Sequence, residues 1–364
     1  MKTHQPVRSP TQSDIAKVAG VTAATVSMAL RNDPRITPST QEKVRQAAKS
    51  LHYKPDPILS ALVARRDLNR KHRAYANIAA LLDDRWDPKI HSQWLNSFIA
   101  GMQASSARFG YNLDIIHLQR DLGSKRQPDR LLHSRGIRGV ILMPLFNQEL
   151  IAQLQWSRYS AVGLGHPPQS LPINRVGSDA FQAMHIACLR LRELGYRRIG
   201  LINHMIAEQR LRYEWLGAIS KEHFLPDSGL TILQPHLPTI LEPDSLLDWV
   251  RKGKPDAVIT NHGHIFHWLN AAGFSVPEKL GLVLLNRDFS EPVGAAGLSQ
   301  HLDASGEAAV ELLHTLLLRG ETGFPSVPRE VLIRPHWVDG FTLRKQSPAP
   351  PSPAARKRSK SPKS

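Results

Sequence analysis

The segment from Thr22 to Leu30 combines side chains that suit contact with the edges of DNA bases. Small side chains let a helix enter the major groove closely, hydroxyl groups hydrogen-bond to base edges, and apolar groups contact the thymine methyl. The candidates for reading DNA sequence are Ala23, Ala24, Thr25, Ser27 and Met28. Small helical domains without DNA partners also contain two such helices, so this segment alone leaves both interpretations open.

The residues around this segment predict two packed helices. Ile15, Val18 and Ala19 form an apolar stripe at i, i+3 and i+4, and Val26, Ala29 and Leu30 repeat the spacing after a turn. Gly20 lies where the chain must reverse within a few residues. Thr22 is a natural N-cap for the second helix.

A third helix is expected to begin with Thr37 as N-cap and Pro38 at its first position. Its apolar residues would complete a small core: Val44, Ala47, Ala48 and Leu51. Polar and basic residues near the three helices could position the protein on the DNA backbone without reading sequence. These candidates are Thr22, Arg31, Asn32, Arg35 and Lys43.

Residues 11–66 closely resemble the lactose-repressor (LacI/GalR) family, and the resemblance continues more loosely to about residue 343. The motifs that match are Asp14-Ile-Ala16, Ala19-Gly-Val-Thr22, Thr25-Val-Ser-Met-Ala-Leu-Arg-Asn32, and Thr37 to Val44 with Leu51 to Pro55. The resemblance implies a hinge helix at residues 58–66 that orders when two copies pair over the DNA minor groove. Leu62 would be the side chain wedged between bases there, with Leu59 beside it.

The net charge of +16 is concentrated at the two ends of the chain. Residues 1–73 contain 14 Lys or Arg and 5 Asp or Glu, and residues 344–364 contain 7 Lys or Arg and no acidic residue. Residues 74–343 contain 26 of each kind. Because phosphate neutralisation depends on local Lys and Arg, DNA contact is expected at the two ends. The tail could either strengthen nonspecific binding or be a simple extension.

The rest of the chain alternates apolar strands with helices, which favours parallel sheets with helices on both faces. The expected strands are Tyr75–Leu82, Tyr111–Leu118, Gly139–Met143, Ser160–Leu164, Arg198–Ile202, Leu230–Leu233, Asp256–Thr260, Leu280–Leu285 and Val331–Arg334. The expected helices are Trp94–Gly110, Pro128–Arg135, Phe181–Leu194, Arg210–His223, Leu246–Lys252, Ile265–Ala272 and Ala304–Arg319.

The fold expected is an all-α helix-turn-helix head followed by an α/β body with two lobes. The resemblance implies a body like a periplasmic sugar-binding protein, in which the chain crosses between lobes three times, here near Pro167, Ala296 and Pro325. The expected parts are a flexible arm (1–10), the head (11–53), a hinge and linker (54–73), the effector-binding and dimerisation domain (74–343), and a disordered basic tail (344–364).

A small polar effector is expected between the lobes, after the carboxyl ends of strands. The candidates to bind it are Asp84, Trp86, Arg210, Glu214, Asn261, His262 and Asp288. Sugar-binding members of the family carry Arg at the position of Glu214 and Asp at that of His262, so a conventional hexose fits poorly. A different sugar, a nucleoside and another small polar molecule remain open. The family's usual Arg for reading guanine is replaced by Met28.

Composition and motifs bear on the remaining function classes. Histidines 262, 264 and 267 are spaced poorly for one metal ion, so neither a metal nor a cofactor is expected. Cys188, the single cysteine, excludes an intramolecular disulfide and fits a cytoplasmic, nucleoid-associated protein. No membrane span, secretory signal, G-x-S-x-G elbow, P-loop or G-x-G-x-x-G fingerprint is visible.

The sequence therefore predicts a homodimeric transcriptional regulator, a repressor, that binds a near-palindromic DNA operator. Effector binding would change the angle between the lobes and so the DNA affinity. The alternatives are a nonspecific nucleoid-type DNA-binding protein, a solute-binding protein and an α/β enzyme.

Overall fold

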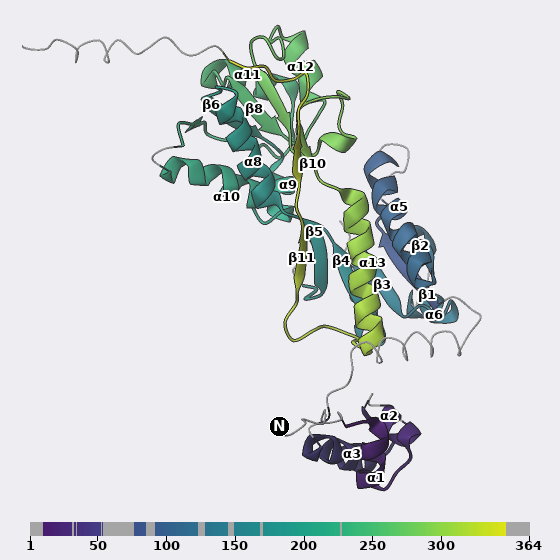
Figure 1. Cartoon of the computed structure of the whole chain (residues 1–364). Helices are drawn as coiled ribbons and strands as arrows, with labels where there is room; N and C mark the ends of the chain where they lie inside the picture. The colour runs from purple at the N-terminus through teal and green to yellow at the C-terminus, as the bar shows by residue number, and fades with distance from the viewer. Residues whose placement is uncertain are drawn as a thin grey trace, which may run out of the picture. The chain divides into compact units, whose positions relative to one another are not determined.

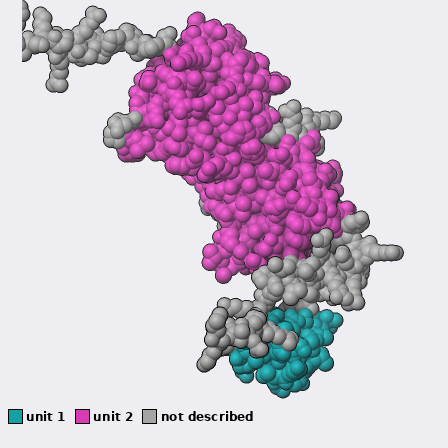
Figure 2. All heavy atoms as spheres, viewed as in Figure 1, with its two compact units in different colours: residues 1–74 teal, residues 75–364 magenta. Residues whose placement is uncertain are grey.

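The computed structural model describes residues 10–30, 33, 35–51, 53, 76–84, 92–122, 128–144, 149–167, 170–225 and 228–346. The chain divides into two compact units, residues 1–74 and 75–364, each of which is considered by itself (Figure 2). The predicted arm up to residue 9, the hinge with Leu59 and Leu62, and the tail from residue 347 lie outside the described residues. So do Arg31, Asn32 and Trp86. Within the described part, no helix is long and apolar enough to cross a membrane.

The first unit is a bundle of three helices: α1 (Gln12–Ala19), α2 (Ala23–Leu30) and α3 (Pro38–Ser50). Ile15, Val26 and Val44 are fully buried where the helices meet. Val18 is 56% exposed, so its predicted place in the core is wrong, and Ala16, two positions earlier, is buried instead. Each residue of a helix is rotated by about 100° from the one before it, so positions i+3 and i+4 point in different directions. In α1 only one of these two positions faces the core.

Side-chain caps fix where the three helices begin. The Asp14 carboxylate accepts hydrogen bonds from the backbone N–H and the hydroxyl of Thr11, at 2.8 and 2.7 Å. The Thr25 N–H donates to Thr22 Oγ1 at 3.1 Å, and the Thr40 N–H donates to Thr37 Oγ1 at 3.4 Å. Both predicted threonine N-caps are thereby confirmed. Gly20 ends α1 with a φ of 63°, a left-handed conformation that glycine adopts without strain.

The second unit contains two six-stranded sheets, each with helices packed against it (Figure 1). The first sheet, in the N-lobe, has the order β11-β5-β4-β3-β1-β2 and is parallel throughout. Its strands are β1 (Ala76–Leu82), β2 (Tyr111–His117), β3 (Gly139–Leu142), β4 (Ser160–Leu164), β5 (Asn174–Ser178) and β11 (Glu330–Ile333). Its helices are α5 (Ser92–Phe109), α6 (Pro128–Ser134), α7 (Glu149–Ala152) and α13 (Leu302–Arg319).

The second sheet, in the C-lobe, has the order β12-β10-β9-β8-β6-β7. Its strands are β6 (Arg198–Ile202), β7 (Thr231–Ile232), β8 (Ala257–Thr260), β9 (Gly281–Leu284), β10 (Gly297–Ser299) and β12 (His336–Val338). Its helices are α8 (Ala180–Glu193), α9 (Met205–Arg210), α10 (Glu214–Ser220), α11 (Pro243–Gly253) and α12 (Ile265–Ala271). The expectation of parallel sheets is confirmed except at β12, which pairs antiparallel with β10 at the edge.

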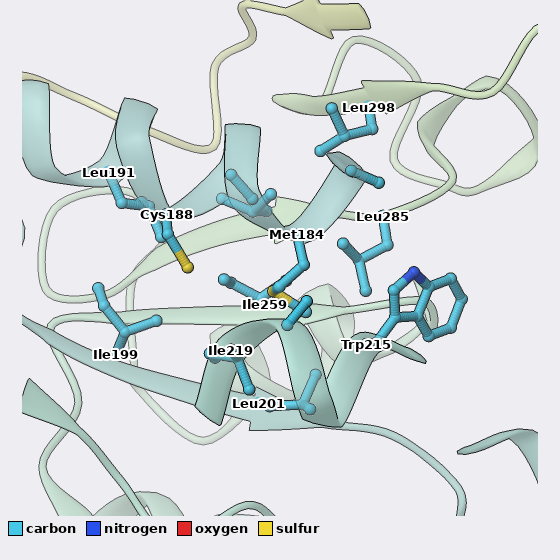
Figure 3. Close-up of a cluster of buried hydrophobic side chains, with 14 of the residues drawn as sticks. Met184, Cys188, Leu191, Ile199, Leu201, Trp215, Ile219, Ile259, Leu285 and Leu298 are labelled. Atoms are coloured by element: carbon cyan, nitrogen blue, oxygen red, sulfur yellow. The ribbon is translucent and has the colours of Figure 1, made fainter. Parts of the chain in front are cut away.

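Apolar side chains between α8, α10 and the strands form the main core of the C-lobe (Figure 3). Met184 and Cys188 of α8 lie with Ile199, Leu201 and Ile259 of the sheet in this cluster. Burial raises the pKa of the Cys188 thiol to about 12, because the thiolate loses its hydration. Cys188 is therefore a packing residue with an unreactive thiol.

The chain crosses between the lobes at three places that differ from the predicted ones. It passes from β5 to α8 near Asp179, from β10 to α13 at Gln300 and His301, and from β11 to β12 near Pro335. Pro167 connects β4 with β5 and Pro325 connects α13 with β11, so each joins elements of the N-lobe, while Ala296 precedes β10. The predictions failed because β5, β10 and β12 are short strands without a long apolar run.

The predicted single helix from Arg210 to His223 is also wrong. Arg212 and Tyr213 adopt left-handed conformations, with φ of 52° and 60°, and separate α9 from α10. Neither residue is glycine, asparagine or proline, so the sequence contains no signal for the break. A 3₁₀ turn over Lys221–Phe224 then follows α10.

Helices α5 and α13 pack side by side on the N-lobe sheet at very short range (Figure 1). Gly101 of α5 faces the backbone of Asp303, and Gly306 of α13 faces the backbone of Phe98 and Met102. A side chain at either glycine would overlap backbone atoms of the other helix. The two glycines therefore set the separation of this helix pair.

Candidate DNA-binding surface and inter-lobe cavity

The five predicted base-reading residues lie on the outer face of α2 or at the margin of that face. Ala23 and Ala24 are exposed, and Thr25, Ser27 and Met28 are half-buried. Val26 and Ala29, on the opposite face, are buried against α1 and α3. The face is narrow, uncharged and mostly apolar, which suits close approach to a groove and contact with methyl groups.

The predicted DNA-backbone residues that are described have different surroundings. Thr22 is exposed and caps α2, and Lys43 is exposed on α3. Arg35 pairs with Asp33, with 2.7 Å between its Nη2 and Asp33 Oδ2 and 2.9 Å between its Nε and Oδ1. A phosphate would therefore compete with Asp33 for the Arg35 guanidinium, whereas the Lys43 ammonium has no carboxylate within 4.0 Å among the described residues.

A cavity of about 690 Å³ lies between the two lobes of the second unit. This volume is in the range of small-molecule sites. The N-lobe contributes mainly aromatic and apolar side chains, and the C-lobe contributes amides, imidazoles and an indole. The residues that line it are Trp94, Phe98, Pro144, Gly165, His166, Ser178, Ala180, His204, Ile206, Ala207, Arg210, Leu211, Trp215, Thr239, Asn261, His262, Asn286, Ser290, Gln300 and Leu302.

Three of the predicted effector-binding residues, Arg210, Asn261 and His262, line this cavity. Asp288 lies behind the lining, where its carboxylate accepts hydrogen bonds from the Ser299 hydroxyl at 2.6 Å and the Gln300 N–H at 3.2 Å. It thus helps to position Gln300.

The other two described candidates, Asp84 and Glu214, are also absent from the lining. The Asp84 carboxylate accepts hydrogen bonds from the backbone N–H groups of Gln119 and Arg120. Glu214 is engaged with N-lobe residues, at 3.0 Å from His166 Nε2. Neither carboxylate therefore faces the cavity as the sequence suggested.

Four buried polar atoms in the lining lack a hydrogen-bond partner among the described residues. They are the Trp215 indole N–H and three amide oxygens, Asn261 Oδ1, Asn286 Oδ1 and Gln300 Oε1. Gln300 is only 4% exposed, and its amide nitrogen donates to the Leu285 carbonyl, which fixes the direction of its oxygen. Buried polar groups normally have partners, so these atoms indicate a site for a polar molecule.

Asn286 and Gln300 were missed by the sequence reasoning, although both follow C-lobe strands. Asn286 comes two residues after the end of β9, so the rule on strand carboxyl ends could have found it. Gln300 follows β10, a three-residue strand that the sequence pattern does not reveal. Trp215, Trp94 and Phe98 lie on helices, where an aromatic residue is more often part of the core.

His262 is held in its neutral form by a buried polar network. Its Nε2 lies 2.9 Å from Asn203 Oδ1, and Asn203 Nδ2 donates to Glu208 Oε1 at 2.7 Å. Burial, with smaller effects from His204 and His264, lowers the pKa of His262 to about 3. Because Asn203 Oδ1 can only accept, the His262 Nε2 carries the proton. Among the described residues, no three His, Cys, Asp or Glu side chains are arranged to bind a metal ion.

Acidification should destabilise the protein through His262. Between pH 6.5 and about 3 the unfolded chain binds a proton at this residue and the folded chain does not, so stability is lost as the pH falls below 6.5. At about 1.4 kcal/mol per pH unit, wild type should lose about 2 kcal/mol between pH 6.5 and 5 from this group. Urea unfolding of His262→Gln, which keeps a donor for Asn203, should show that loss abolished. The same change at exposed His223 is the control, and equal pH slopes for wild type and His262→Gln would contradict the assignment.

Comparisons with known proteins agree with this geometry. Residues 11–56 match the family model "Bacterial regulatory proteins, lacI family", and residues 189–343 match "Periplasmic binding protein-like domain". The HTH-type transcriptional repressor PurR of Aliivibrio salmonicida is 23% identical over 194 residues, which span 53% of this chain and about half, 54%, of that protein. Catabolite control protein A of Staphylococcus epidermidis is 23% identical over 281 residues, 75% of this chain and 81% of that protein.

Among solved structures, the lac repressor dimer bound to operator and the anti-inducer ONPF aligns with a TM-score of 0.56 at 17% identity. The alignment covers 93% of this chain and 100% of that chain. At this identity the likeness concerns the fold, and it extends over both units. The two family models add the type of head and the type of body. Residues 11–56 thus belong to the lacI family of bacterial regulatory proteins, and a periplasmic binding protein-like domain follows at residues 189–343.

Proposed function

We propose that this chain is a sequence-specific transcriptional repressor that binds operator DNA as a homodimer and responds to a small molecule in the inter-lobe cavity. The observation that carries the DNA-binding part is the uncharged outer face of α2, a helix whose start is fixed by the cap at Thr22. One such helix contacts too few base pairs for useful specificity, so two copies on a two-fold site are needed.

Sequence recognition by α2 would depend on apolar contact and DNA shape. Ala23, Ala24 and Met28 have no hydrogen-bond donor in their side chains, so they cannot form the paired bonds that identify guanine or adenine. Hydroxyl groups at Thr25 and Ser27 can contact either kind of base. We therefore expect half-sites that are rich in thymine methyl groups at the positions that face α2.

The effector we infer is a molecule without positive charge that has a flat or apolar face and several N–H or O–H groups. Three amide oxygens and one indole N–H of the lining residues have no hydrogen-bond partner among the described residues. Because the three amide oxygens are acceptors, the ligand should provide hydrogen-bond donors. Among the described residues no Asp or Glu lines the cavity and His262 is neutral, so the lining disfavours a cation, and Arg210 supplies hydrogen-bond donors. Trp94, Phe98 and Leu302 supply the apolar wall opposite. Uncharged sugars and nucleosides both have this chemistry.

Selection of DNA from a random library by the full-length protein, at about 0.15 M salt, tests the DNA-binding part. Enrichment of a palindrome with a flexible central step would support a dimeric regulator. Binding to all sequences alike, and falling uniformly as salt rises, would instead identify a nonspecific nucleoid-type protein.

Thermal melting tests the effector part, because a molecule that binds only the folded state raises Tm. An effector of the cavity should raise the Tm of wild type but much less that of Gln300→Ala. Tighter binding of cationic ligands than of neutral sugars or nucleosides would contradict the inferred ligand class.

A further inference from the structure

We propose that a set of charged residues joining the two lobes holds them together in the absence of effector. This cross-lobe network consists of Arg212 and Glu214 from the C-lobe and His166, Arg175 and Glu330 from the N-lobe. The proposal concerns the body of the protein and adds a ligand-independent restraint to the proposed function, on which its consequence for DNA binding rests.

Glu214 makes the contacts that cross from one lobe to the other. Its Oε1 lies 3.0 Å from His166 Nε2 and 3.7 Å from Arg175 Nη2. His166 follows β4 and Arg175 belongs to β5, so one carboxylate at the start of α10 reaches two segments of the N-lobe. Both N-lobe side chains are well buried, with 9% and 5% of their surface exposed.

Arg175 is held by contacts within its own lobe in addition to its contact with Glu214. Its Nη1 donates to the Gly165 carbonyl at 3.2 Å, and its Nη2 lies 2.8 Å from Glu330 Oε2 on the neighbouring strand β11. Its Nε has no hydrogen-bond partner among the described residues. A buried guanidinium with an unsatisfied N–H depends on nearby carboxylates, and the loss of Glu214 would leave Arg175 with Glu330 alone.

The charge of Arg212, on the C-lobe, also acts on Glu330 of the N-lobe. Glu330 has a lowered pKa, mainly because of Arg175, with further favourable interactions from Arg212 and His166. The Glu214 carboxylate thus lies against both Arg175 and His166, and Glu330 pairs with the same Arg175. Such an arrangement is screened less by salt than isolated surface pairs, because its central members are buried.

The backbone before Glu214 is strained in a way that fits this role. Arg212 and Tyr213 are both left-handed, which is costly for residues with a Cβ. Strained residues persist where surrounding contacts hold them. The strain breaks the helix between α9 and α10 and places Arg212 and Glu214 at the boundary with the N-lobe.

Distances between two spin labels, one on each lobe, test the proposal directly. Ser134→Cys in the N-lobe and Lys252→Cys in the C-lobe are exposed label sites, and native Cys188 is too buried to react. The full chain is measured without DNA or effector, diluted into unlabelled protein so that only distances within one chain are read. Wild type should give one narrow distribution, and Glu214→Gln should broaden it toward longer distances.

Glu193→Gln is the matched control, because Glu193 pairs with Arg190 inside α8 and not across the lobes. It removes the same charge and should leave the distribution unchanged. If Glu214→Gln folds poorly, His166→Gln removes the shortest contact from the other side and should widen the distribution likewise. Superimposable distributions for wild type and a folded Glu214→Gln or His166→Gln would overturn the proposal. Since no DNA or effector is present, that result would leave the DNA-binding function untouched.

Discussion

Gly306→Ala should destabilise the body by at least about 3 kcal/mol, and Gly306→Val should prevent the N-lobe from folding. A methyl group at Gly306 would lie 2.3 Å from the Phe98 carbonyl oxygen and 3.0 Å from the Met102 nitrogen. Both are backbone atoms of α5, so no side-chain rotation relieves the overlap. The helices must separate, and the apolar cluster that Val310 and Leu313 of α13 form with Met102 would loosen.

Urea unfolding of the full-length protein measures this effect, and Gly217→Ala supplies the control. Gly217 also lies in a helix, α10, but nothing stands within 4 Å of the place where its Cβ would be. Alanine there should stabilise the protein by up to about 1 kcal/mol, because alanine is the better helix former. A Gly306→Ala protein as stable as wild type would show that α5 and α13 are not in the close contact described.

Met28→Arg should change the DNA sequence that the protein selects. An arginine on the outer face of α2 can donate two hydrogen bonds to guanine O6 and N7, which discriminates by about 1–3 kcal/mol, or roughly tenfold to a hundredfold. We expect a new preference for G at one position of each half-site. Sequencing of the DNA selected by the wild-type and variant proteins measures it.

Val18→Arg is the control for the added charge. Val18 is 56% exposed on α1, outside the predicted recognition face, so arginine there should strengthen binding to all sequences without changing the preferred bases. An identical selected sequence for wild type and Met28→Arg would place residue 28 away from the bases and would count against the recognition face.

The head could be predicted from sequence almost completely, because each local signal agrees with its neighbours. Thr22 and Thr37 mark helix starts, Gly20 marks the turn, and buried Ile15, Val26 and Val44 follow helical spacing. The body was predicted by class and by most of its strands. Long apolar runs such as β1 and β4 are visible without any tertiary information.

The sequence pattern did not reveal the elements that are held by long-range polar contacts. β5 reads Asn-Arg-Val-Gly-Ser, which does not look like a buried strand, yet Asn174 and Arg175 are 2% and 4% exposed. Their hydrogen-bond partners include Arg329, Glu330 and Gly165, residues near in space but mostly distant along the chain. Missing β5 misplaced the first crossing between lobes. Missing β10 in the same way concealed Gln300, the most buried amide of the cavity.

Candidate effector residues were predicted with partial success for a similar reason. Two residues chosen for their position after a strand, Asn261 and His262, line the cavity, because the fold places strand ends there. Charge was a poor guide: the Asp84, Glu214 and Asp288 carboxylates bind backbone groups or other side chains of the protein. A carboxylate that the chain itself satisfies cannot be told from a ligand-binding one by its position in the sequence.

The order of the three crossings also affects how the chain must fold during synthesis. The N-lobe is the first part of the body to leave the ribosome, yet its core needs Leu302, Val310 and Leu313 of α13, and its sheet needs β11 at residues 330–333. The C-lobe strands β6 to β10 are made in between. At about 5–20 residues per second, the nascent N-lobe waits on the order of 10 s for its covering helix. During that time its unfinished apolar face is a natural substrate for chaperones that act on chains still attached to the ribosome.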